Sequence, residues 1–437
     1  MLNSVWTENV KMPRFESLEG DRRTDVLIVG GGIAGLLCGY ELRQRGIDHI
    51  LIEADRICHG VTRNTTAKLT SQHGLIYHKI ASKYGDEAAF LYWQANVDAI
   101  AKYRHLAEKY SCDLENQDNY IYSKSNKKLL DDEMAVLSRL GIPAKLTAPS
   151  DLPFQTLGAV CFSNQGQFQP LKFLSQIARE VNICEHTAAK QFAPHTVITD
   201  RGKIKAEKIV VATHFPLLNK HGAFFLKMYQ DRSYVLALER AKPMEGMYLD
   251  EGKDGLSFRT FGDLLLIGCG SHRTGKKTDG WAAAEGFAKE YFPDAKVRYR
   301  WATQDCMTLD GVPYIGQYSK NTPDLYVATG FNKWGMTSAM VAASVLADLI
   351  EGKENPYASL FSPGRGILHP QLIVNGFEAA GGLLRFSVSR CPHMGCALKW
   401  NPFEHSWDCS CHGSRFTALG KLENEPATGD LKHRRTK

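Results

Sequence analysis

Asp25-Val26-Leu27-Ile28-Val29-Gly30-Gly31-Gly32-Ile33-Ala34-Gly35 is the stretch that decides the fold. Its four consecutive apolar residues, 26–29, are typical of a buried parallel strand. Glycines then follow at GxGxxG spacing. The first allows the turn out of the strand, the second lets the backbone approach a pyrophosphate, and the third lets a helix pack on the strand. These three are Gly30, Gly32 and Gly35.

The residues after this stretch complete a βαβ unit. We predict a helix from about Ile33 to Arg45, with its N-terminal N–H groups facing a diphosphate. A second apolar run, Ile50-Leu51-Ile52, ends in Glu53, where an acidic side chain accepts hydrogen bonds from a ribose. The pattern predicts a dinucleotide site. The competing interpretation is a glycine-rich turn in an ordinary α/β protein.

Length and charge narrow the class of protein. The chain has 437 residues, 43% of them hydrophobic, and a net charge of +6. The length suggests two or three domains. The charge is mild, and no basic helix with interleaved aromatics indicates nucleic-acid binding. The basic end, Lys432–Lys437, is interpreted either as a solvated terminus or as a docking patch for an acidic redox partner.

Targeting signals are not found in the sequence. Residues 1–23 are mixed and polar, and we expect a leader that lies on the surface. Without an apolar secretion segment or a run of about 18 apolar residues, we expect a cytoplasmic protein with no membrane span.

A polar loop follows the second strand. Residues 58–68 carry the hydrogen-bonding side chains of Thr62, Arg63, Thr66 and Lys68 at the same carboxyl edge of the sheet. These can bind phosphates or a ring system. The alternative is an ordinary polar loop.

Patterns further along the chain predict a second domain. Residues 80–112 have a helical apolar stripe, and a further helix is expected from Pro170 to Val181. Between them, 113–151 is less regular and is expected to enter the second domain. Alternating runs within 224–300 favour an antiparallel substrate domain.

A second strand–glycine–helix junction lies some 300 residues after the first. Residues 208–214 and 325–330 are predicted strands, and a long apolar helix opens at Trp334 and runs to about Ile350. Its N–H groups can meet the far end of a large cofactor.

At this point the sequence resembles a known family. Residues 24–352 are similar to the FAD-dependent oxidoreductases of the D-amino-acid-oxidase/glycine-oxidase superfamily. The resemblance rests on 29–35, Glu53, 60–68, 210–213, 310–316 and 328–337. It implies an α/β FAD/NAD(P)-binding (Rossmann-like) domain with an antiparallel α+β substrate domain, and FAD as cofactor. The residues expected to contact FAD are Gly30, Gly32, Ile33, Ala34, Gly35, Glu53, Ala54, Thr62, Arg63, Thr66, Lys68, Gly330, Trp334, Gly335, Met336 and Thr337.

Three side chains are candidates for catalysis. Arg259, on a predicted strand of the substrate domain, can clamp a carboxylate with its bidentate fork, although a surface arginine fits equally well. His73 and His214 lie near predicted flavin loops, as bases or as structural histidines. Cys306 is a candidate for a covalent flavin link, as in some relatives.

Four further cysteines crowd into the C-terminal segment. Cys391 and His393 form a CxH pair, and Cys409 and His412 form a CxxH pair. Two thiolates and two imidazoles bind either zinc or a [2Fe–2S] cluster. The CxH spacing, an extra cysteine in each box, and Gly395 and Gly413 for tight loops favour the cluster.

These boxes closely resemble those of Rieske proteins of the respiratory-complex type. The resemblance implies cluster ligands Cys391, His393, Cys409 and His412, and a disulfide between Cys396 and Cys411. Pro392 and Ser410 replace the usual Thr and Pro. Phe416 replaces a Tyr that donates to a ligand sulfur, which implies a lower potential.

The segment before the first box is short for such a domain. We expect strands at 372–374 and 383–388, and a small all-β domain that depends on the flavoprotein for burial. The predicted organisation is therefore a leader (1–23), a flavoprotein (24–360) and a shortened Rieske domain (362–437). The FAD-binding parts are 24–78, 165–220 and 300–352. The substrate parts are 79–164 and 221–299.

The predicted function is a FAD-dependent dehydrogenase. A small amine or amino acid gives a hydride to FAD, and the Rieske cluster passes the electrons singly to an external acceptor. The alternatives are a reductase with reversed flow from a donor protein, a non-catalytic redox sensor or carrier, and a structural zinc module.

Overall fold

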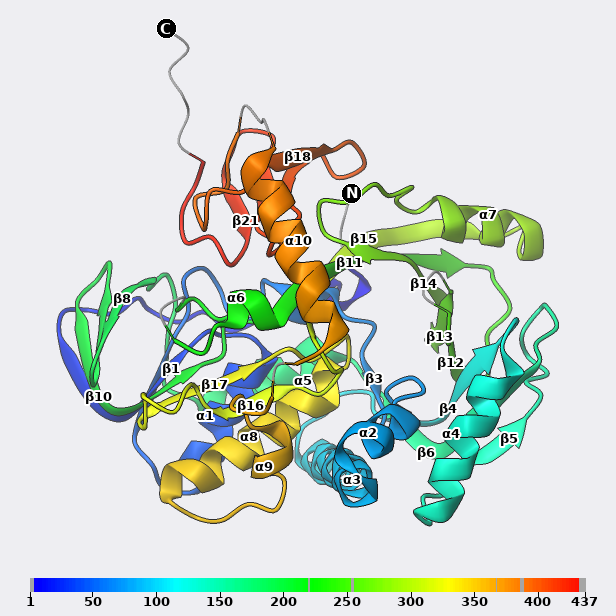
Figure 1. Ribbon diagram of the computed structural model, residues 1–437, viewed down its shortest axis with the longest axis horizontal. Helices are drawn as coiled ribbons and strands as arrows, with labels where there is room; N and C mark the ends of the chain where they lie inside the picture. Colours follow the sequence, from blue (N-terminus) through cyan, green and yellow to red (C-terminus); the bar gives the residue numbers. More distant parts are fainter. Residues whose placement is uncertain (1–3, 219–220, 253–254, 367, 386–388, 432–437) are drawn as a thin grey trace, which may run out of the picture.

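The computed structural model describes residues 4–218, 221–252, 255–366, 368–385 and 389–431. Within them the chain forms two large sheets and one small sheet, with helices around them (Figure 1). The basic end of the sequence, 432–437, lies outside the described residues. No helix in the described part combines the length and the apolar character needed to cross a bilayer.

The first sheet contains the glycine-rich strand. Its strands are β1 (Arg22–Val29), β2 (His49–Ile52), β7 (Ile183–Cys184), β8 (Ala189–Ala193), β9 (Thr196–Thr199), β10 (Lys203–Val211), β16 (Tyr314–Gln317) and β17 (Leu325–Thr329). The order is β16-β17-β10-β1-β2-β7, and β9 joins β8 to β10. β1 pairs in parallel with β2 and β10, and β10 with β17. The carboxyl ends of these four strands therefore meet at one edge.

Helices α1 (Ile33–Gln44) and α8 (Gly335–Glu351) pack against each other beside this sheet. Both begin at the two junctions that the sequence predicts. An added Cβ at Gly35 would lie 1.9 Å from the carbonyl oxygen of Gly30. Only glycine allows α1 to approach β1 this closely.

The second sheet is the larger one. Its strands are β3 (Lys68–Leu69), β4 (Glu115–Ser123), β5 (Lys145–Thr147), β6 (Gly158–Gln167), β11 (Met228–Glu239), β12 (Gly246–Asp250), β13 (Ser257–Phe261), β14 (Leu264–Arg273) and β15 (Lys296–Thr308). The order is β15-β11-β14-β13-β12-β4-β6-β3, with β5 on β6. It is antiparallel, as predicted, except that β12 runs parallel to β4.

The other helices surround the sheets. They are α2 (Tyr77–Tyr84), α3 (Asp86–Lys109), α4 (Lys127–Arg139), α5 (Pro170–Ile177), α6 (Phe224–Lys227), α7 (Ala282–Tyr291), α9 (Ala358–Phe361) and α10 (Pro370–Leu384). The helix predicted over 80–112 is interrupted at Gly85. The φ of +89° at Gly85 ends α2 and starts α3 in a new direction.

The N-terminal segment is not a surface leader. Trp6 is fully buried, its ring meets Phe261 edge-on at 4.7 Å between centroids, and its indole N–H donates to the Thr65 carbonyl at 2.6 Å. The Ser4 hydroxyl donates to the carbonyl of Arg63. The segment thus braces the polar loop that was predicted to bind the cofactor.

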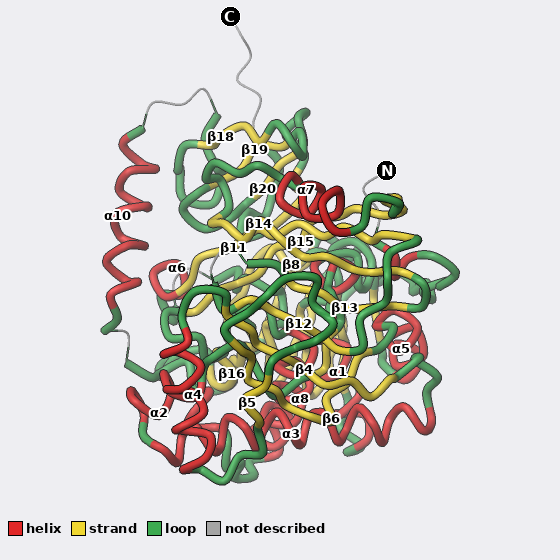
Figure 2. The backbone as a smooth tube through the Cα atoms, turned by 90° about the vertical axis from the view of Figure 1, so that its right-hand side faces the viewer, coloured by secondary structure: helices red, strands yellow, loops and turns green. Residues whose placement is uncertain are grey.

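The C-terminal domain has a four-stranded antiparallel sheet of β18 (Leu398–Asn401), β19 (Ser406–Cys409), β20 (Arg415–Thr417) and β21 (Leu422–Asn424). The strands predicted before it are wrong: 372–374 and 383–384 belong to α10, and 386–388 lie outside the described residues. Pro370 at the first turn and the His369 ring, which accepts from the N–H of Gln371, start this helix. Figure 2 shows α10 standing beside the small sheet.

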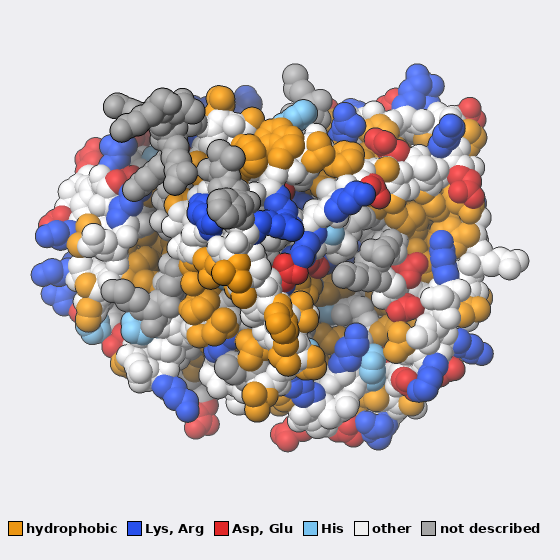
Figure 3. All heavy atoms as spheres, turned by 45° about the horizontal axis from the view of Figure 1, so that its top comes forward, with side chains coloured by type: hydrophobic (Ala, Val, Ile, Leu, Met, Phe, Trp, Pro, Cys, Tyr) orange, Lys and Arg blue, Asp and Glu red, His pale blue; other side chains and the backbone are white. Residues whose placement is uncertain are grey.

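One face of α10 is exposed and apolar. Ile373, Phe377 and Leu384 are 64%, 75% and 84% exposed, whereas Asn375 and Gly382 on the opposite face are buried. Figure 3 shows hydrophobic side chains gathered on this side of the molecule.

Candidate functional site

A cavity of about 1370 Å³ lies at the carboxyl edge of the first sheet. Its walls come from the ends of β1, β2, β10 and β17, and from β11 and β15 of the second sheet. Residues 421–425, 427 and 428 of the C-terminal domain also line it. All three parts of the chain therefore meet around one space.

Most residues predicted to contact FAD line this cavity. They are Gly30, Gly32, Ile33, Ala34, Glu53, Ala54, Thr62, Thr66, Lys68, Gly330, Trp334, Gly335 and Met336. Gly35, Arg63 and Thr337 are not among its lining residues. Gly35 instead contacts Gly30, and the Thr337 hydroxyl lies 3.0 Å from His73 Nε2.

The glycine positions fit a nucleotide. Gly30 has φ +113°, and Gly330 has φ +70°. A Cβ added to Gly30 would lie 2.6 Å from the backbone oxygen of Ala212, and a Cβ added to Gly330 would lie 2.3 Å from Thr308 Cγ2. The Glu53 carboxylate accepts the N–H of Gly31 at 2.7 Å. These residues shape a cradle with backbone N–H groups and an acid at its rim, as FAD requires.

His73 lines the cavity but is held by the protein. Its ring stacks on Trp334 at 4.8 Å between centroids, Nδ1 lies 2.7 Å from the Tyr92 hydroxyl, and Nε2 lies 2.8 Å from the Thr70 carbonyl. Burial lowers the pKa of His73 to about 3. This histidine is neutral and positions Trp334 at the start of α8.

The structure does not support a carboxylate clamp at Arg259. Its guanidinium is buried, donates to the carbonyls of Thr66 and Ala67 at 2.6 and 2.9 Å, and lies over the Trp6 ring. Arg259 is not among the residues that line the cavity. Arg259 fixes the loop in front of Lys68. The pKa of Lys68 is lowered to about 7, mainly because its ammonium group is buried and also because the positive charge of Arg259 lies nearby.

His214 lines the cavity and joins it to the C-terminal domain. Its Nδ1 lies 2.6 Å from Oε1 of Glu425, and its Nε2 accepts the N–H of Cys306 at 3.3 Å. Burial opposes a charge on His214, but Cys306 and the Glu425 carboxylate raise its pKa well above the ordinary value. The cysteine that is a candidate for a flavin link therefore lies directly beside this imidazole.

Sequence reasoning missed the acidic wall of the cavity. Asp231 on β11 and Asp305 on β15 are direct cross-strand partners, and both line the cavity. Lys333 Nζ lies 3.9 Å from Asp231. The available signal was the alternation of polar Tyr229, Asp231 and Ser233 along one face of a strand.

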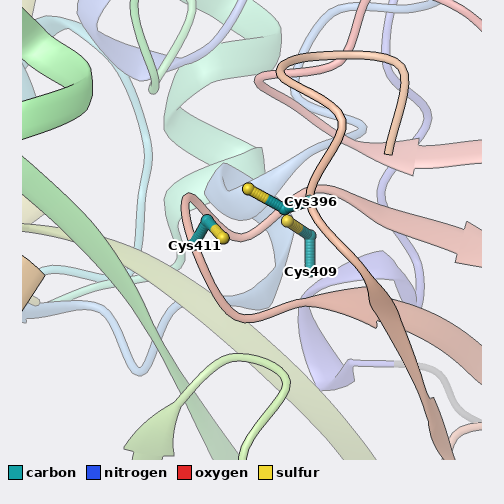
Figure 4. A group of neighbouring side chains, drawn as sticks. All are labelled: Cys396, Cys409 and Cys411. Carbon is teal, nitrogen blue, oxygen red and sulfur yellow. The ribbon is translucent and has the colours of Figure 1, made fainter. Parts of the chain in front are cut away.

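The two cysteine boxes come together on the side of the small domain that faces the flavoprotein. The sulfurs of Cys396, Cys409 and Cys411 lie within 4.8 Å of one another and point toward a common centre (Figure 4). The Cys391 thiol hydrogen-bonds to Cys409 and to the Ser414 hydroxyl. Gly395 and Gly413, with φ of +77° and +93°, close the two loops as predicted.

The two histidines of the boxes complete a donor set for a [2Fe–2S] cluster. The rings of His393 and His412 are 5.0 Å apart between centroids and perpendicular. Burial lowers the pKa of His393 to about 3 and that of His412 to about 4, so both are in the neutral form that binds metal. Nδ1 of His412 is buried without a hydrogen-bond partner among the described residues. These residues fit the cluster.

The predicted disulfide is not present, because Cys396 and Cys411 are both free thiols. The backbone of α10 covers them instead. An added Cβ at Gly382 would lie 2.3 Å from the Cys411 sulfur, and Cys411 Sγ lies 3.7 Å from the Glu378 carbonyl. Helix packing, not a covalent bond, closes the site on this side.

The C-terminal domain is docked through buried polar contacts. Arg232 on β11 pairs with Glu404 at 2.9 Å from its Nε, and Glu404 also accepts from Arg415 at 3.0 Å. All three side chains are 7% exposed or less. No local pattern predicts this contact, because Arg232 and Glu404 are 172 positions apart in the chain.

The histidine edge of the boxes faces the flavoprotein. The buried Phe215 ring lies 6.4 Å between centroids from both His393 and His412, and Phe225 lies 6.3 Å from His412. Phe215 follows His214 directly in the chain. One residue thus separates the cavity wall from the imidazoles.

Comparisons with known proteins agree with both sites. A family model of FAD dependent oxidoreductases matches residues 25–349, and a model of the Rieske [2Fe-2S] domain matches 370–434. The putative Rieske 2Fe-2S iron-sulfur protein YhfW of Bacillus subtilis (strain 168) is 34% identical over 492 residues, which covers 98% of this chain and 97% of the relative.

Two further likenesses concern the flavoprotein. The gamma-glutamylputrescine oxidoreductase of Escherichia coli (strain K12) is 22% identical over 78% of this chain and 87% of its own length. The crystal structure of glycine oxidase from Geobacillus kaustophilus superposes with a TM-score of 0.66 at 22% identity, covering 79% of this chain and 100% of that chain. This chain belongs to the FAD-dependent oxidoreductase family, and it carries a C-terminal Rieske domain with a [2Fe–2S] cluster as its second cofactor.

Proposed function

We propose that this protein is a dehydrogenase that oxidises a small amine or amino-acid-like substrate and passes the electrons within the chain to the cluster. When bound, FAD supplies a hydride acceptor and the cluster a one-electron carrier. The observation that carries the proposal is the Phe215 contact. Its ring touches both cluster histidines from the end of β10, whose neighbouring residues line the cavity.

The orientation of the C-terminal domain supports internal transfer. His412 is 3% exposed, and the rings of Phe215 and Phe225 cover its edge. A partner molecule cannot reach this imidazole from solvent while the domain is docked. The cavity is the nearest redox site available to it, so we assign the histidine edge to electron entry from the flavin.

The substrate class rests on the family relatives and on the cavity wall. The relatives include a glycine oxidase and a gamma-glutamylputrescine oxidoreductase, and the compounds in these two names both contain a C–N bond. Asp231 and Asp305 on one wall provide carboxylates that can hold the ammonium group of such a substrate, and Lys333 can hold a carboxylate. Lys68, with a pKa of about 7, is a cavity residue able to accept the proton that an ammonium must lose before its C–H bond is oxidised.

The test is anaerobic bleaching of the flavin absorbance by a panel of amines, amino acids and hydroxy acids. We expect bleaching by a compound with a C–N bond, followed by reduction of the cluster. Bleaching by hydroxy acids alone would overturn the substrate class. If none of the compounds bleaches the flavin, but a reductant that delivers electrons to the cluster does, electrons would flow in the reverse direction, from the cluster to the flavin.

A further inference from the structure

Three side chains of the flavoprotein hold the second cysteine box by its backbone. Arg273, at the end of β14, donates from Nε to the carbonyl of Ser410 at 3.0 Å and from Nη2 to that of Cys411 at 2.9 Å. Four consecutive carbonyls of the loop, 410–413, accept such bonds. The other two donors are Gln230, to His412 at 2.8 Å, and Gln304, to Gly413 at 2.9 Å.

Arg273 also contacts parts of the protein outside the loop. Its remaining terminal nitrogen, Nη1, donates to Asn375 Oδ1 of α10 at 2.8 Å, and Asn375 in turn donates to the carbonyl of Leu226. The guanidinium lies 4.9 Å from the ring centre of Tyr229, which lines the cavity. Arg273 therefore touches the cluster loop, the helix that covers the free thiols, and the cavity wall.

Gln230 and Gln304 hold the same loop as Arg273 and are themselves fixed by buried hydrogen bonds. Both are 1% exposed, and Gln304 donates to Gln230 Oε1 at 2.6 Å while the Thr274 hydroxyl donates to Gln304 at 3.2 Å. Gly413 packs so closely that an added Cβ would lie 2.6 Å from Gln230 Cβ. The side-chain amides cannot rotate away without losing several buried hydrogen bonds.

We propose that Arg273 is a positioning residue of the cluster, supplied by the flavoprotein half, which holds the Cys409–Ser414 loop and raises the reduction potential of the cluster with its charge. A guanidinium is charged at all ordinary pH values and presents its donors in a fixed fork. A positive charge at the ligand loop favours the state with one more electron, and the half-buried guanidinium is screened by water less than an exposed one.

The domain has no described strand before its first box, so the cluster loop needs support from elsewhere in the chain. Elsewhere in the domain, α10 and four short strands supply the frame. The loop that carries Cys409 and His412 has its carbonyls satisfied by β11, β14 and β15 instead of by strands of its own domain. The cluster site is thus completed by the other half of the chain.

The experiment is an equilibrium redox titration of the full-length protein, followed by EPR of the reduced cluster and visible absorbance of the flavin. We expect Arg273→Gln to lower the potential of the cluster and change its EPR line shape while the flavin potential stays unchanged. Arg273→Lys, which keeps the charge and loses the fork, should restore part of the potential but not the line shape. The titration needs no substrate, so a failure of the proposed amine oxidation would not affect it.

A matched control is Lys276→Gln. Lys276 is also a cation at this interface, but its ammonium hydrogen-bonds to Glu378 of α10 and not to the loop carbonyls 410–413. We expect it to retain the wild-type potential and EPR signal. Gln304→Glu, an isosteric change that replaces the donor to Gly413 with an acceptor, should also lower the potential.

Loss of cluster iron in Arg273→Gln, with full iron in Lys276→Gln, would support the positioning role as well. A fully loaded Arg273→Gln protein with wild-type potential and line shape would overturn the proposal. An equal shift in Arg273→Gln and Lys276→Gln would also overturn it, since it would reflect general surface charge.

Discussion

Nδ1 of His214 lies 2.6 Å from Oε1 of Glu425, which places one residue of the flavin cavity in direct contact with one residue of the cluster-bearing domain. The pair is partly exposed to the cavity, with side-chain exposures of 23% and 25%. Glu425 lies between β21 and the end of the domain, so the ion pair holds the domain against the cavity wall.

Glu425→Gln should make catalysis depend on pH. In the wild type, Cys306 and Glu425 favour the protonated form of His214 and hold its pKa well above the ordinary value. Without the carboxylate, His214 loses its proton as the pH rises through about 6.5. The rate of flavin reduction by substrate should then fall on the order of tenfold relative to the wild type above that pH, and little below it. Stopped-flow absorbance measures this ratio, and His214→Gln should flatten it. A ratio that is constant with pH would contradict the role of the pair.

The contact of Glu404 with Arg232 and Arg415 should make the stability of the protein fall at acidic pH. Burial alone would raise the pKa of Glu404, but Arg232 and Arg415 more than offset this and lower it to about 2. A carboxyl group whose pKa is lower in the folded than in the unfolded protein stabilises the fold at pH values above its unfolded-state pKa, which is about 4.3 for Glu. This stabilisation is lost as the pH falls toward 2.

The measurement is urea unfolding of wild type and Glu404→Gln at several pH values. We expect the variant to be about 3–5 kcal/mol less stable near neutral pH, because two buried arginines lose their partner. The difference should shrink as the pH falls from about 5 to about 2. Glu285→Gln, which removes an exposed pair with Arg300, should show no such dependence. A difference that stays constant with pH would show that Glu404 is not ionised in the folded state.

Arg259→Met should destabilise the protein without weakening substrate binding. The change leaves two buried carbonyls without donors and removes the contact with Trp6, which together cost about 2–4 kcal/mol. Thermal unfolding and KM for the best substrate test this. Arg139→Met, at an exposed pair with Asp86, is the control for stability. A KM raised on the order of a hundredfold at unchanged stability would restore Arg259 as a carboxylate clamp.

Gly35→Ala should remove FAD and spare the cluster. The methyl group would lie 1.9 Å from the Gly30 carbonyl, so α1 must move away from β1 and the phosphate cradle opens. We expect purified protein with little flavin absorbance and a normal cluster EPR signal. Gly286→Ala, in α7, meets nothing within 4 Å and should keep both cofactors. Full flavin content in Gly35→Ala would contradict the assigned cradle.

The local patterns were sufficient for both cofactor sites. The GxGxxG run, the acid at Glu53 and the two cysteine boxes predict their elements because each works through neighbours in the chain. Most of the predicted FAD contacts indeed line one cavity. The helix α10 was mistaken for strands because its β-branched Ile373 and Val374 favour strands in isolation, and its packing onto the cysteine loops overrides that preference.

Contacts between residues far apart in the chain could not be predicted from local sequence patterns. Trp6 resembles a residue of a polar leader until Phe261 and the Thr65 carbonyl are seen around it. Arg259 resembles a substrate clamp because a lone arginine on a strand carries no sign of which carbonyls it meets. Arg273 and Glu425 drew no attention, since their roles depend on how two domains face each other.

The proposed function depends on electron transfer from the flavin to the cluster within one chain. Anaerobic flash photoreduction of the flavin, followed by rapid freezing and EPR, tests it most directly. We expect the reduced-cluster signal to grow as the flavin absorbance recovers, at a rate that does not depend on protein concentration. A cluster that stays oxidised beside a reduced flavin, or a rate proportional to protein concentration, would contradict it.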